Sequence, residues 1–326
     1  MASRSAKISN KKLDVIYIAG SGRSGSTIMD RVLGTYPGAA SFNEVYRLLI
    51  EGVDEDNFCA CGEAFSACSF WQNIVADVLP REEDIKRVRY LHNRFDHTRH
   101  VLRLLLFPFG RKYRRELDEY CQWLGKLYFS LSKYSGCPVL VDSSKVPSRA
   151  LLLSRVPGVQ VHLVHLVRDL HAVTNAWMKE KFNPAAGESL PTYGINRSIL
   201  FWYARQFMTE LLRLRLPYRR VLYEDFARRP AEVFQPGWIQ TESLRNERLP
   251  FEEDGSIILK PLHSIGGNPD RFSSGPTVLK LDEKWRHEMP AGARKRISTI
   301  GFPLLWRYGY TRSESQRKKE LAKDLS

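Results

Sequence analysis

Residues 14–29 read DVIYIAGSGRSGSTIM, and this stretch decides which fold the rest of the chain must complete. A short apolar run rich in β-branched residues leads into a loop of glycines and serines. Apolar residues such as Ile28, Met29 and Val32 then recur on one face of a helix. Glycines let backbone N–H groups turn into such a loop, and the helix N-terminus adds positive potential. The stretch therefore predicts a strand, a phosphate-binding loop and a helix.

The predicted loop has the spacing of a P-loop with one substitution. Gly20 and Gly25 stand five positions apart, as in that motif. Ser26 replaces the lysine that contacts the β- and γ-phosphates in nucleotide triphosphatases, and Arg23 lies within the loop. The loop therefore predicts a phosphate-rich ligand that is bound without ATP hydrolysis.

The composition favours an anionic partner. The chain has 326 residues, enough for one large α/β domain or two smaller ones, and a formal net charge of +14. Nucleic acid, an anionic membrane surface and an anionic nucleotide all fit this charge. The arginines are spread over predicted helices without a recognised nucleic-acid motif, so nucleic acid is not the expected partner.

The two ends of the chain differ from its middle. We expect a single domain at residues 13–310, with flexible charged tails at residues 1–12 and 312–326. The first tail lacks the apolar segment of a secretory signal, and no run reaches the roughly 18 apolar residues that span a bilayer. The expected location is therefore cytoplasmic.

Strands and helices alternate along the rest of the chain. Apolar strands that end in polar residues are predicted at residues 138–142, 159–167 and 220–225, with helices at about 170–182 and 195–215. This order predicts a P-loop-like α/β fold in three layers, with a central parallel sheet flanked by helices. Because ligands bind beyond the carboxyl ends of parallel strands, polar residues there become candidates. They are Arg23, Lys145, Arg168 and Tyr223.

A helical insert is predicted at about 72–135. Within it, residues 99–115 place an apolar block between cations, as in an element that lies on a membrane surface. A core helix that ends at Pro108 and Gly110 explains the same pattern and is the preferred interpretation. Peripheral contact with a membrane through this segment stays open.

The five cysteines are too few and too scattered for a disulfide scaffold. Cys59, Cys61 and Cys68 lie close enough in sequence to ligate a metal, but tetrahedral zinc normally has four ligands. His92 and His97 are the candidates for a fourth. Buried or structural thiols are the preferred interpretation, and no metal is expected.

A second anion-binding loop is predicted near the C-terminal end. Gly266 and Gly267 offer backbone N–H groups there, and Arg271 offers a guanidinium fork. Arg168, at a strand end just before a helix, can pair with a further phosphate. A nucleotide with phosphates at both ends of its ribose would use both of these features and the first loop.

Taken together, the motifs resemble those of sulfotransferases that use 3′-phosphoadenosine 5′-phosphosulfate (PAPS), in particular the bacterial, carbohydrate-type branch. The loop at residues 22–27 is similar to their 5′-phosphosulfate loop, and residues 166–169 are similar to the start of their 3′-phosphate motif. Further segments match that branch in the same order: residues 142–145, 223–226 with Pro230, 267–272 and 281–286. The resemblance covers most of the chain from residue 14 to about 290.

The resemblance implies transfer of a sulfuryl group from PAPS to a hydroxyl or amine, with no metal required. The implied acceptor is a carbohydrate, a glycolipid or a small-molecule alcohol. The residues implied for the 5′-phosphosulfate are Gly22, Arg23, Ser24, Gly25, Ser26 and Thr27. Those implied for the 3′-phosphate are Arg168, Gly266, Gly267 and Arg271, while Tyr223 lies against the adenine. Ala176 departs from the family, which has a serine there, so the 3′-phosphate site is expected to depend more on the second loop.

Three residues are expected to carry the transfer. Glu44 resembles the glutamate base of tyrosylprotein and some carbohydrate sulfotransferases, and a carboxylate beside a cationic loop can accept the acceptor's proton. Arg23 is expected to face the sulfuryl group. Lys145 is expected to stabilise charge on the bridging oxygen of the leaving nucleotide, or to stand near the acceptor. The simpler alternatives are that Glu44 caps a helix or pairs with an arginine, and that Lys145 is a surface lysine.

Two other functions stay open at this point. A different nucleotide-dependent P-loop transferase or kinase fits the fold, although the missing lysine counts against it. A basic nucleic-acid-binding protein fits the charge. The strand histidines His162 and His165 are expected to be packed and hydrogen-bonded rather than catalytic.

Overall fold

The computed structural model describes residues 12–106, 110–184, 187–239, 241 and 243–311. Their core is a parallel sheet of five strands in the order β2-β3-β1-β4-β7. The strands are β1 (Leu13–Gly20), β2 (Ala39–Ser41), β3 (Val139–Lys145), β4 (Val159–Val167) and β7 (Tyr218–Leu222). The predicted α/β fold with a central parallel sheet is therefore confirmed. The predicted tails lie outside the described residues, except for Lys12.

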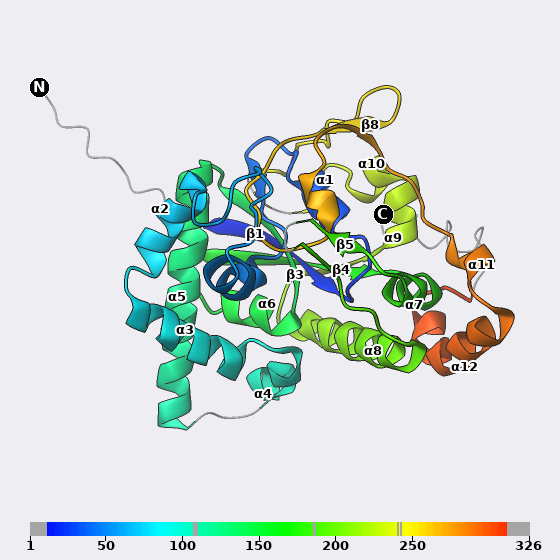
Figure 1. Cartoon of the computed structure of the whole chain (residues 1–326), viewed down its shortest axis with the longest axis horizontal. Helices are drawn as coiled ribbons and strands as arrows, with labels where there is room; N and C mark the ends of the chain where they lie inside the picture. The colour runs from blue at the N-terminus through cyan, green and yellow to red at the C-terminus, as the bar shows by residue number, and fades with distance from the viewer. Residues whose placement is uncertain (1–11, 107–109, 185–186, 240, 242, 312–326) are drawn as a thin grey trace, which may run out of the picture.

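Helices cover both faces of this sheet (Figure 1). One face packs against α5 (Arg111–Ser135), α6 (Pro147–Leu153) and α8 (Ile195–Leu211). The opposite face packs against α1 (Ser26–Leu33), α9 (Tyr223–Arg228) and a hairpin of β8 (Ser256–Leu259) and β9 (Gly275–Val278). The remaining elements are α2 (Ser69–Val78), α3 (Glu82–Phe95), α4 (Val101–Leu106), α7 (Leu170–Met178), β5 (Phe182–Asn183), β6 (Glu188–Ser189), α10 (Pro230–Val233), α11 (Trp285–Glu288), α12 (Ala291–Arg307) and short 3₁₀ or π turns.

The strand β1 lies at the centre because both of its faces are apolar. Val15 and Tyr17 pack toward α5 and α6, whereas Ile16 and Ile18 pack toward α1, and all four are fully buried. β1 pairs with β3 on one side and with β4 on the other. The glycine loop that follows β1 therefore opens between two neighbouring strand ends, where ligands bind in sheets of this kind.

Two details of the predicted sheet are wrong. The strand predicted at residues 220–225 ends at Leu222, and Tyr223 begins helix α9, whose first turn carries Glu224 and Asp225. Acidic side chains are favoured at a helix N-terminus, and this preference outweighs the β-propensity of the segment. The sequence does not predict β2, because a strand of three residues shows no alternation that a pattern could detect.

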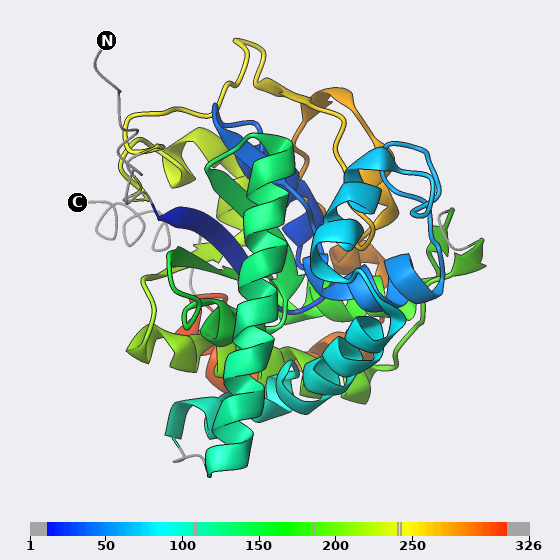
Figure 2. The same cartoon turned by 90° about the vertical axis from the view of Figure 1, so that its left-hand side faces the viewer.

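The predicted helical insert forms helices α2, α3, α4 and α5, and Figure 2 shows α5 running the length of the molecule in front of the sheet. Val101 and Leu104 of α4 are buried in the core, which agrees with the core-helix interpretation of this part of residues 99–115. Residues 107–109, including Pro108, lie outside the described residues. No helix in the described part of the chain is long and apolar enough to cross a membrane.

A buried polar network fastens the insert to the sheet layer. Arg149 of α6 donates to the carboxylate of Asp96 at 2.7 Å, and Tyr120 of α5 donates to the same carboxylate at 3.0 Å. His92 of α3 lies 3.1 Å from the Tyr120 hydroxyl, and burial lowers the pKa of His92 to about 4. His92 therefore belongs to this network and not to the cysteines for which the sequence offered it as a ligand.

The two strand histidines are both hydrogen-bonded. His162 Nε2 lies 2.8 Å from a carboxylate oxygen of Asp14. His165 is fully buried in β4, with its ring nitrogens 2.6 Å from the Tyr218 hydroxyl and 2.5 Å from the side-chain oxygen of Gln206. Burial lowers the pKa of His165 to about 4, so the folded protein holds this imidazole in its neutral form at neutral pH.

Replacement of His165 by asparagine is expected to reduce the sensitivity of the protein to mild acid. The unfolded chain binds a proton at this histidine near pH 6.5, whereas the folded protein resists protonation down to about pH 4. The stability that this group contributes is therefore complete above pH 6.5 and is lost as the pH falls from 6.5 to 4. Urea unfolding at pH 7 and at pH 5 should show a smaller loss for His165→Asn than for the wild type.

The matched control is His287→Asn, because His287 is exposed on α11. It should lose as much stability between the two pH values as the wild type does. An equal loss for His165→Asn and the wild type would contradict the assignment of the acid sensitivity to His165.

Candidate functional site

A cavity of about 400 Å³ opens at the carboxyl ends of β1 and β3. It is bounded by the first glycine loop (residues 20–27), residues 44–51, the end of β3, one side of α8 and the second glycine loop (residues 263–272). Its volume is in the range of small-molecule sites. The predicted residues on its wall are Gly22, Arg23, Gly25, Ser26, Thr27, Glu44, Lys145 and Gly267. The other predicted residues, Ser24, Arg168, Tyr223, Gly266 and Arg271, lie behind this wall.

The first glycine loop is confined by aromatic rings on two sides. A Cβ at Gly22 would stand 2.6 Å from the ring of Trp177. Gly25 has φ +87°, and a Cβ there would stand 2.5 Å from the ring of Tyr223. The hydroxyl of Ser24 donates to a carbonyl within the loop at 2.8 Å. A side chain at either glycine would have to displace a ring, so the shape of the loop depends on both glycines.

Arg23 is the cation of this loop. Its guanidinium lies 4.9 Å from the centroid of the Trp177 ring, an arrangement that holds the side chain at the cavity wall. Its buried Nε has no hydrogen-bond partner among the described residues, and burial lowers the pKa of Arg23. A half-buried guanidinium with an unused, buried donor is suited to binding an anion.

Backbone strain is concentrated at the cavity. Among the described residues, four that are not glycine have positive φ: Arg23 at +60°, Asn43 at +54°, Asp56 at +49° and Lys145 at +65°. Arg23 and Lys145 line the cavity, and Asn43 directly precedes Glu44. Such conformations cost free energy and are typical of functional sites, where the surrounding structure holds them in place.

Glu44 and Lys145 form an ion pair on the cavity wall. Lys145 Nζ lies 2.5 Å from Glu44 Oε1, and Arg47 Nε lies 3.7 Å from the other oxygen. Burial alone would raise the pKa of Glu44, but the charges of Lys145 and Arg47 hold this pKa below its usual value. Glu44 precedes a 3₁₀ turn (Val45–Arg47) without capping it. The Lys145 side chain is only 12% exposed, so the surface-lysine alternative is wrong.

The second glycine loop is docked closely onto this pair. A Cβ at Gly266 would stand 2.7 Å from a side-chain atom of Arg47 and 3.0 Å from one of Glu44, so only glycine fits there. The N–H of Asn268 lies 3.5 Å from the hydroxyl of Thr27 in the first loop. The two predicted anion-binding loops therefore face the same cavity.

Arg271 holds the second loop from behind. Its side chain is 1% exposed and donates to the carbonyls of Gly267 at 3.1 Å and Phe58 at 3.2 Å. In this arrangement Arg271 contacts the backbone of the loop and does not line the cavity. Its role as a phosphate ligand stays a prediction.

Arg168 holds the first loop in a similar way. It donates to the carbonyl of Arg23 and to the carboxylate of Asp282, both at 3.0 Å, and its guanidinium lies 4.4 Å from the ring centroid of Tyr223. Near Ala176, the hydroxyl of Thr174 is buried without a hydrogen-bond partner among the described residues, and Asn175 donates to a glutamate of α11. Binding of a 3′-phosphate by Arg168 stays a prediction too.

Several residues of the wall were not anticipated from the sequence. Arg205 of α8 donates to the carbonyl of Lys145 at 2.9 Å and so supports its positive φ. Trp177 stacks on Tyr193, with ring centroids 4.5 Å apart, and Tyr193 contacts Phe201. No motif marks Trp177, Phe201 or Arg205, because they reach the cavity only through the packing of α7 and α8. Tyr193 lies in the segment 180–200, which the sequence predicts to shape the acceptor pocket.

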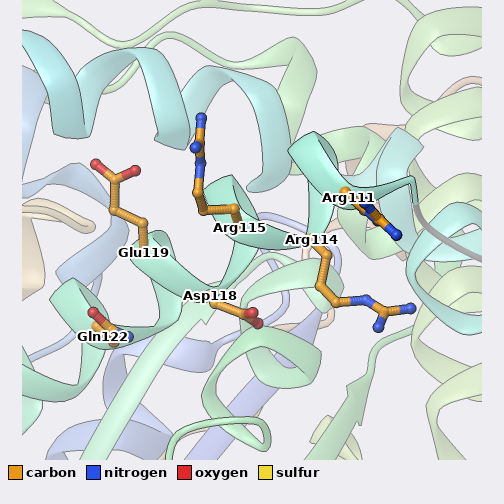
Figure 3. A pocket seen from close by; sticks show the side chains of 6 residues that line it. All are labelled: Arg111, Arg114, Arg115, Asp118, Glu119 and Gln122. Carbon is orange, nitrogen blue, oxygen red and sulfur yellow. The ribbon is translucent and has the colours of Figure 1, made fainter.

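A second hollow lies on the outer side of α5 (Figure 3). All of the residues that line it come from that one helix: Arg111, Arg114, Arg115, Asp118, Glu119 and Gln122. Their side chains point in different directions and do not converge on one point (Figure 3). The cavity at the strand ends, where cations, a carboxylate and backbone N–H groups converge, is therefore the better candidate site.

A double-mutant cycle on Glu44 and Lys145 is expected to show strong coupling. The pair is largely removed from water, so each single variant, Glu44→Gln or Lys145→Met, leaves one buried charge without its partner. The double variant should therefore lose less stability than the sum of the losses in the two single variants. The coupling energy from urea unfolding should be about 1–3 kcal/mol. The exposed pair Glu82–Lys86, changed in the same way, should give a much smaller value. Additive effects at Glu44 and Lys145 would show that the two groups are not paired in solution.

Two solved structures that are similar to this chain are sulfotransferase domains. The domain from the Synechococcus PCC 7002 olefin synthase is 19% identical, with a TM-score of 0.36, over 68% of this chain and 70% of that domain. The domain from the curacin biosynthetic pathway is 15% identical, with a TM-score of 0.42, over 89% of this chain and 98% of that domain. No protein-family model and no curated protein matches the chain. These likenesses are too distant to assign an activity, which must be argued from the geometry of the site.

Proposed function

We propose that this protein is a PAPS-dependent sulfotransferase that transfers a sulfuryl group to a hydroxyl or amine acceptor. The observation that carries the proposal is that a glycine loop without the P-loop lysine shares one cavity with an ion-paired carboxylate. The loop and the N-terminus of α1 suit a 5′-phosphosulfate, and Arg23 adds a cation for the transferring group. A carboxylate that is ionised at neutral pH suits removal of a proton from an acceptor.

The transfer would need little covalent chemistry from the protein. Glu44 would accept the acceptor's proton while the acceptor oxygen bonds to sulfur and the bond from sulfur to the bridging phosphate oxygen breaks. Arg23 would stabilise the sulfuryl oxygens, and Lys145 would turn from Glu44 toward the bridging oxygen, whose negative charge grows. The products would be the sulfated acceptor and adenosine 3′,5′-bisphosphate, with the proton on Glu44.

The 3′-phosphate would be bound by an exchange of partners at Arg168. Asp282 now accepts from Arg168 at 3.0 Å, and its side chain is 45% exposed. A phosphate group could take the place of this carboxylate because both are anions that match a guanidinium. Tyr223, which lies between Arg168 and Gly25, would then stand close to the nucleotide.

The acceptor would approach along the aromatic side of the cavity. This side is formed by Trp177, Tyr193 and Phe201, whose rings contact one another in sequence. Glu44 and Lys145 line the same cavity. Aromatic faces favour acceptors with an apolar ring or the apolar face of a sugar. A carbohydrate, a glycolipid or a small-molecule alcohol would therefore be the acceptor class.

Adenosine 3′,5′-bisphosphate is expected to stabilise the protein. At 100 times its dissociation constant, a ligand that binds only the folded state adds about 2.7 kcal/mol to the free energy of unfolding. Thermal unfolding should therefore shift upward, and Arg23→Ala or Arg168→Ala should abolish the shift. Arg114→Ala, an exposed arginine on α5, is the matched control and should keep it. A shift with Mg²⁺–ATP but none with millimolar bisphosphate would instead favour the kinase alternative.

Glu44→Gln is expected to bind the nucleotide normally but to lose activity. Loss of a general base typically lowers turnover by about 10²–10⁴-fold, whereas the loop that binds the nucleotide stays intact. The test is transfer from radiolabelled PAPS to a panel of sugars, glycolipids and alcohols, with Glu119→Gln on α5 as the control. Wild-type turnover in Glu44→Gln would place the base elsewhere.

A further inference from the structure

A cluster of potential metal ligands lies outside the cavity. The thiols of Cys59, Cys61 and Cys68 and one ring nitrogen of His263 all lie within 4.8 Å of one another. The cysteines come from the segment before α2, whereas His263 begins the second glycine loop, 195 residues after Cys68. None of the three cysteines forms a disulfide. The sequence offered His92 and His97 as a fourth ligand, and the structure brings His263 to the cysteines instead.

The spacing of these atoms matches a tetrahedron around one ion. With Zn–S bonds of about 2.3 Å and Zn–N bonds of about 2.0 Å, tetrahedral angles place two sulfurs about 3.8 Å apart and a sulfur and a nitrogen about 3.5 Å apart. The Cys61 and Cys68 sulfurs are 3.7 Å apart. His263 Nδ1 lies 3.4 Å from the Cys68 sulfur and 3.7 Å from the Cys59 sulfur. Sulfurs at this separation are too far apart for a disulfide bond, which is about 2.05 Å long.

The backbone holds the cysteines in these positions. A bridge pairs Phe58 with Ala64, and Gly62, with φ +95°, makes the turn between them. The N–H of Cys59 donates to the carbonyl of Glu63 at 2.8 Å, and the N–H of Gly62 donates back to the carbonyl of Cys59 at 2.9 Å. The three cysteines are therefore presented by a short hairpin turn and by the N-terminus of α2, where Cys68 precedes the first helical residue.

His263 is fixed just as firmly. Its ring stacks on Phe70 of α2, with ring centroids 4.6 Å apart and planes within 6° of parallel. The N–H of Ala60 donates to the carbonyl of Ser264 at 2.9 Å, which ties the cysteine turn to the residue after His263. A ligand set that packing and backbone hydrogen bonds already hold in place needs little rearrangement to bind an ion.

The donor atoms of the cluster indicate which ion it would suit. No carboxylate belongs to the cluster among the described residues, so its donors are three sulfurs and one nitrogen. This donor set and its tetrahedral shape select zinc over magnesium or calcium.

We propose that Cys59, Cys61, Cys68 and His263 bind one Zn²⁺ ion in a closed structural site. Four protein ligands leave no open position for a substrate, so the ion would act by joining the cysteine segment to the second glycine loop. That loop contacts Glu44 and Arg47 through Gly266, and its Arg271 donates to the carbonyl of Phe58. The zinc would therefore hold one wall of the cavity in place. The proposal does not depend on the proposed sulfotransferase activity.

The test is the metal content of the full chain, purified without added metal or chelator and with any polyhistidine tag removed. Elemental analysis should find about one zinc per chain. Cys61→Ser is the mildest ligand change because Cys61 is exposed, and it should reduce the zinc content at least tenfold, as should His263→Ala. Cys137→Ser, a cysteine outside the cluster, is the matched control and should retain one zinc.

A second measurement covers the case in which the variants fail to fold. After removal of zinc, the wild-type protein should bind one equivalent of Co²⁺ and develop the visible absorption of tetrahedral cobalt–thiolate coordination. The proposal would be overturned if the wild-type protein, as purified, contains no zinc and its cluster thiols all react with a thiol reagent. A disulfide bond between Cys61 and Cys68 in that protein would overturn it too. Full zinc content in both Cys61→Ser and His263→Ala would overturn it as well.

Discussion

The pairing of β1 with β3 is the constraint on which the site depends. Parallel register places Ala19 opposite Lys145, so the first glycine loop and Lys145 leave the sheet side by side. A slip of one residue would turn every side chain of β1 to the opposite face of the sheet. Both faces of β1 carry large apolar side chains that fit different neighbours, and their burial opposes such a slip. The core packing therefore sets the distance between the loop cation and the Glu44–Lys145 pair.

The balance of charge in the cavity follows from this arrangement. Its described wall carries four cations, Arg23, Arg47, Lys145 and Arg205, against the carboxylates of Glu44, Glu51 and Asp270. Removing a charged group from water costs free energy, and an ion pair offsets part of this cost. Among the described residues, Arg23 and Arg205 form no ion pair: Arg23 lies over the ring of Trp177, and Arg205 donates to the carbonyl of Lys145. An anionic ligand would complete the pairing of the site.

The sequence predicts the parts of this structure that are encoded locally. The strand, glycine loop and helix, and the polar residues at the strand ends, follow from periodicity and from the need for glycine at Gly22 and Gly25. The direction of a side chain is not encoded in this way: Arg168 and Arg271 follow the right elements, yet both turn to backbone carbonyls behind the loops. Arg205 and His263 were missed because only tertiary packing brings them to their partners.

The contact between the cysteine segment and the second glycine loop also constrains the order in which the chain folds. Residues 58–60 and 264–271 are joined by two hydrogen bonds: the N–H of Ala60 donates to the carbonyl of Ser264, and the side chain of Arg271 donates to the carbonyl of Phe58. The chain between the two segments is about 200 residues long. Closing a loop of that length costs on the order of 5 kcal/mol of chain entropy before any contact can offset it. The wall that Gly266 presents to Glu44 can therefore form only after the intervening sheet has brought both segments together. During synthesis, this wall is completed only after residues 264–271 have left the ribosome.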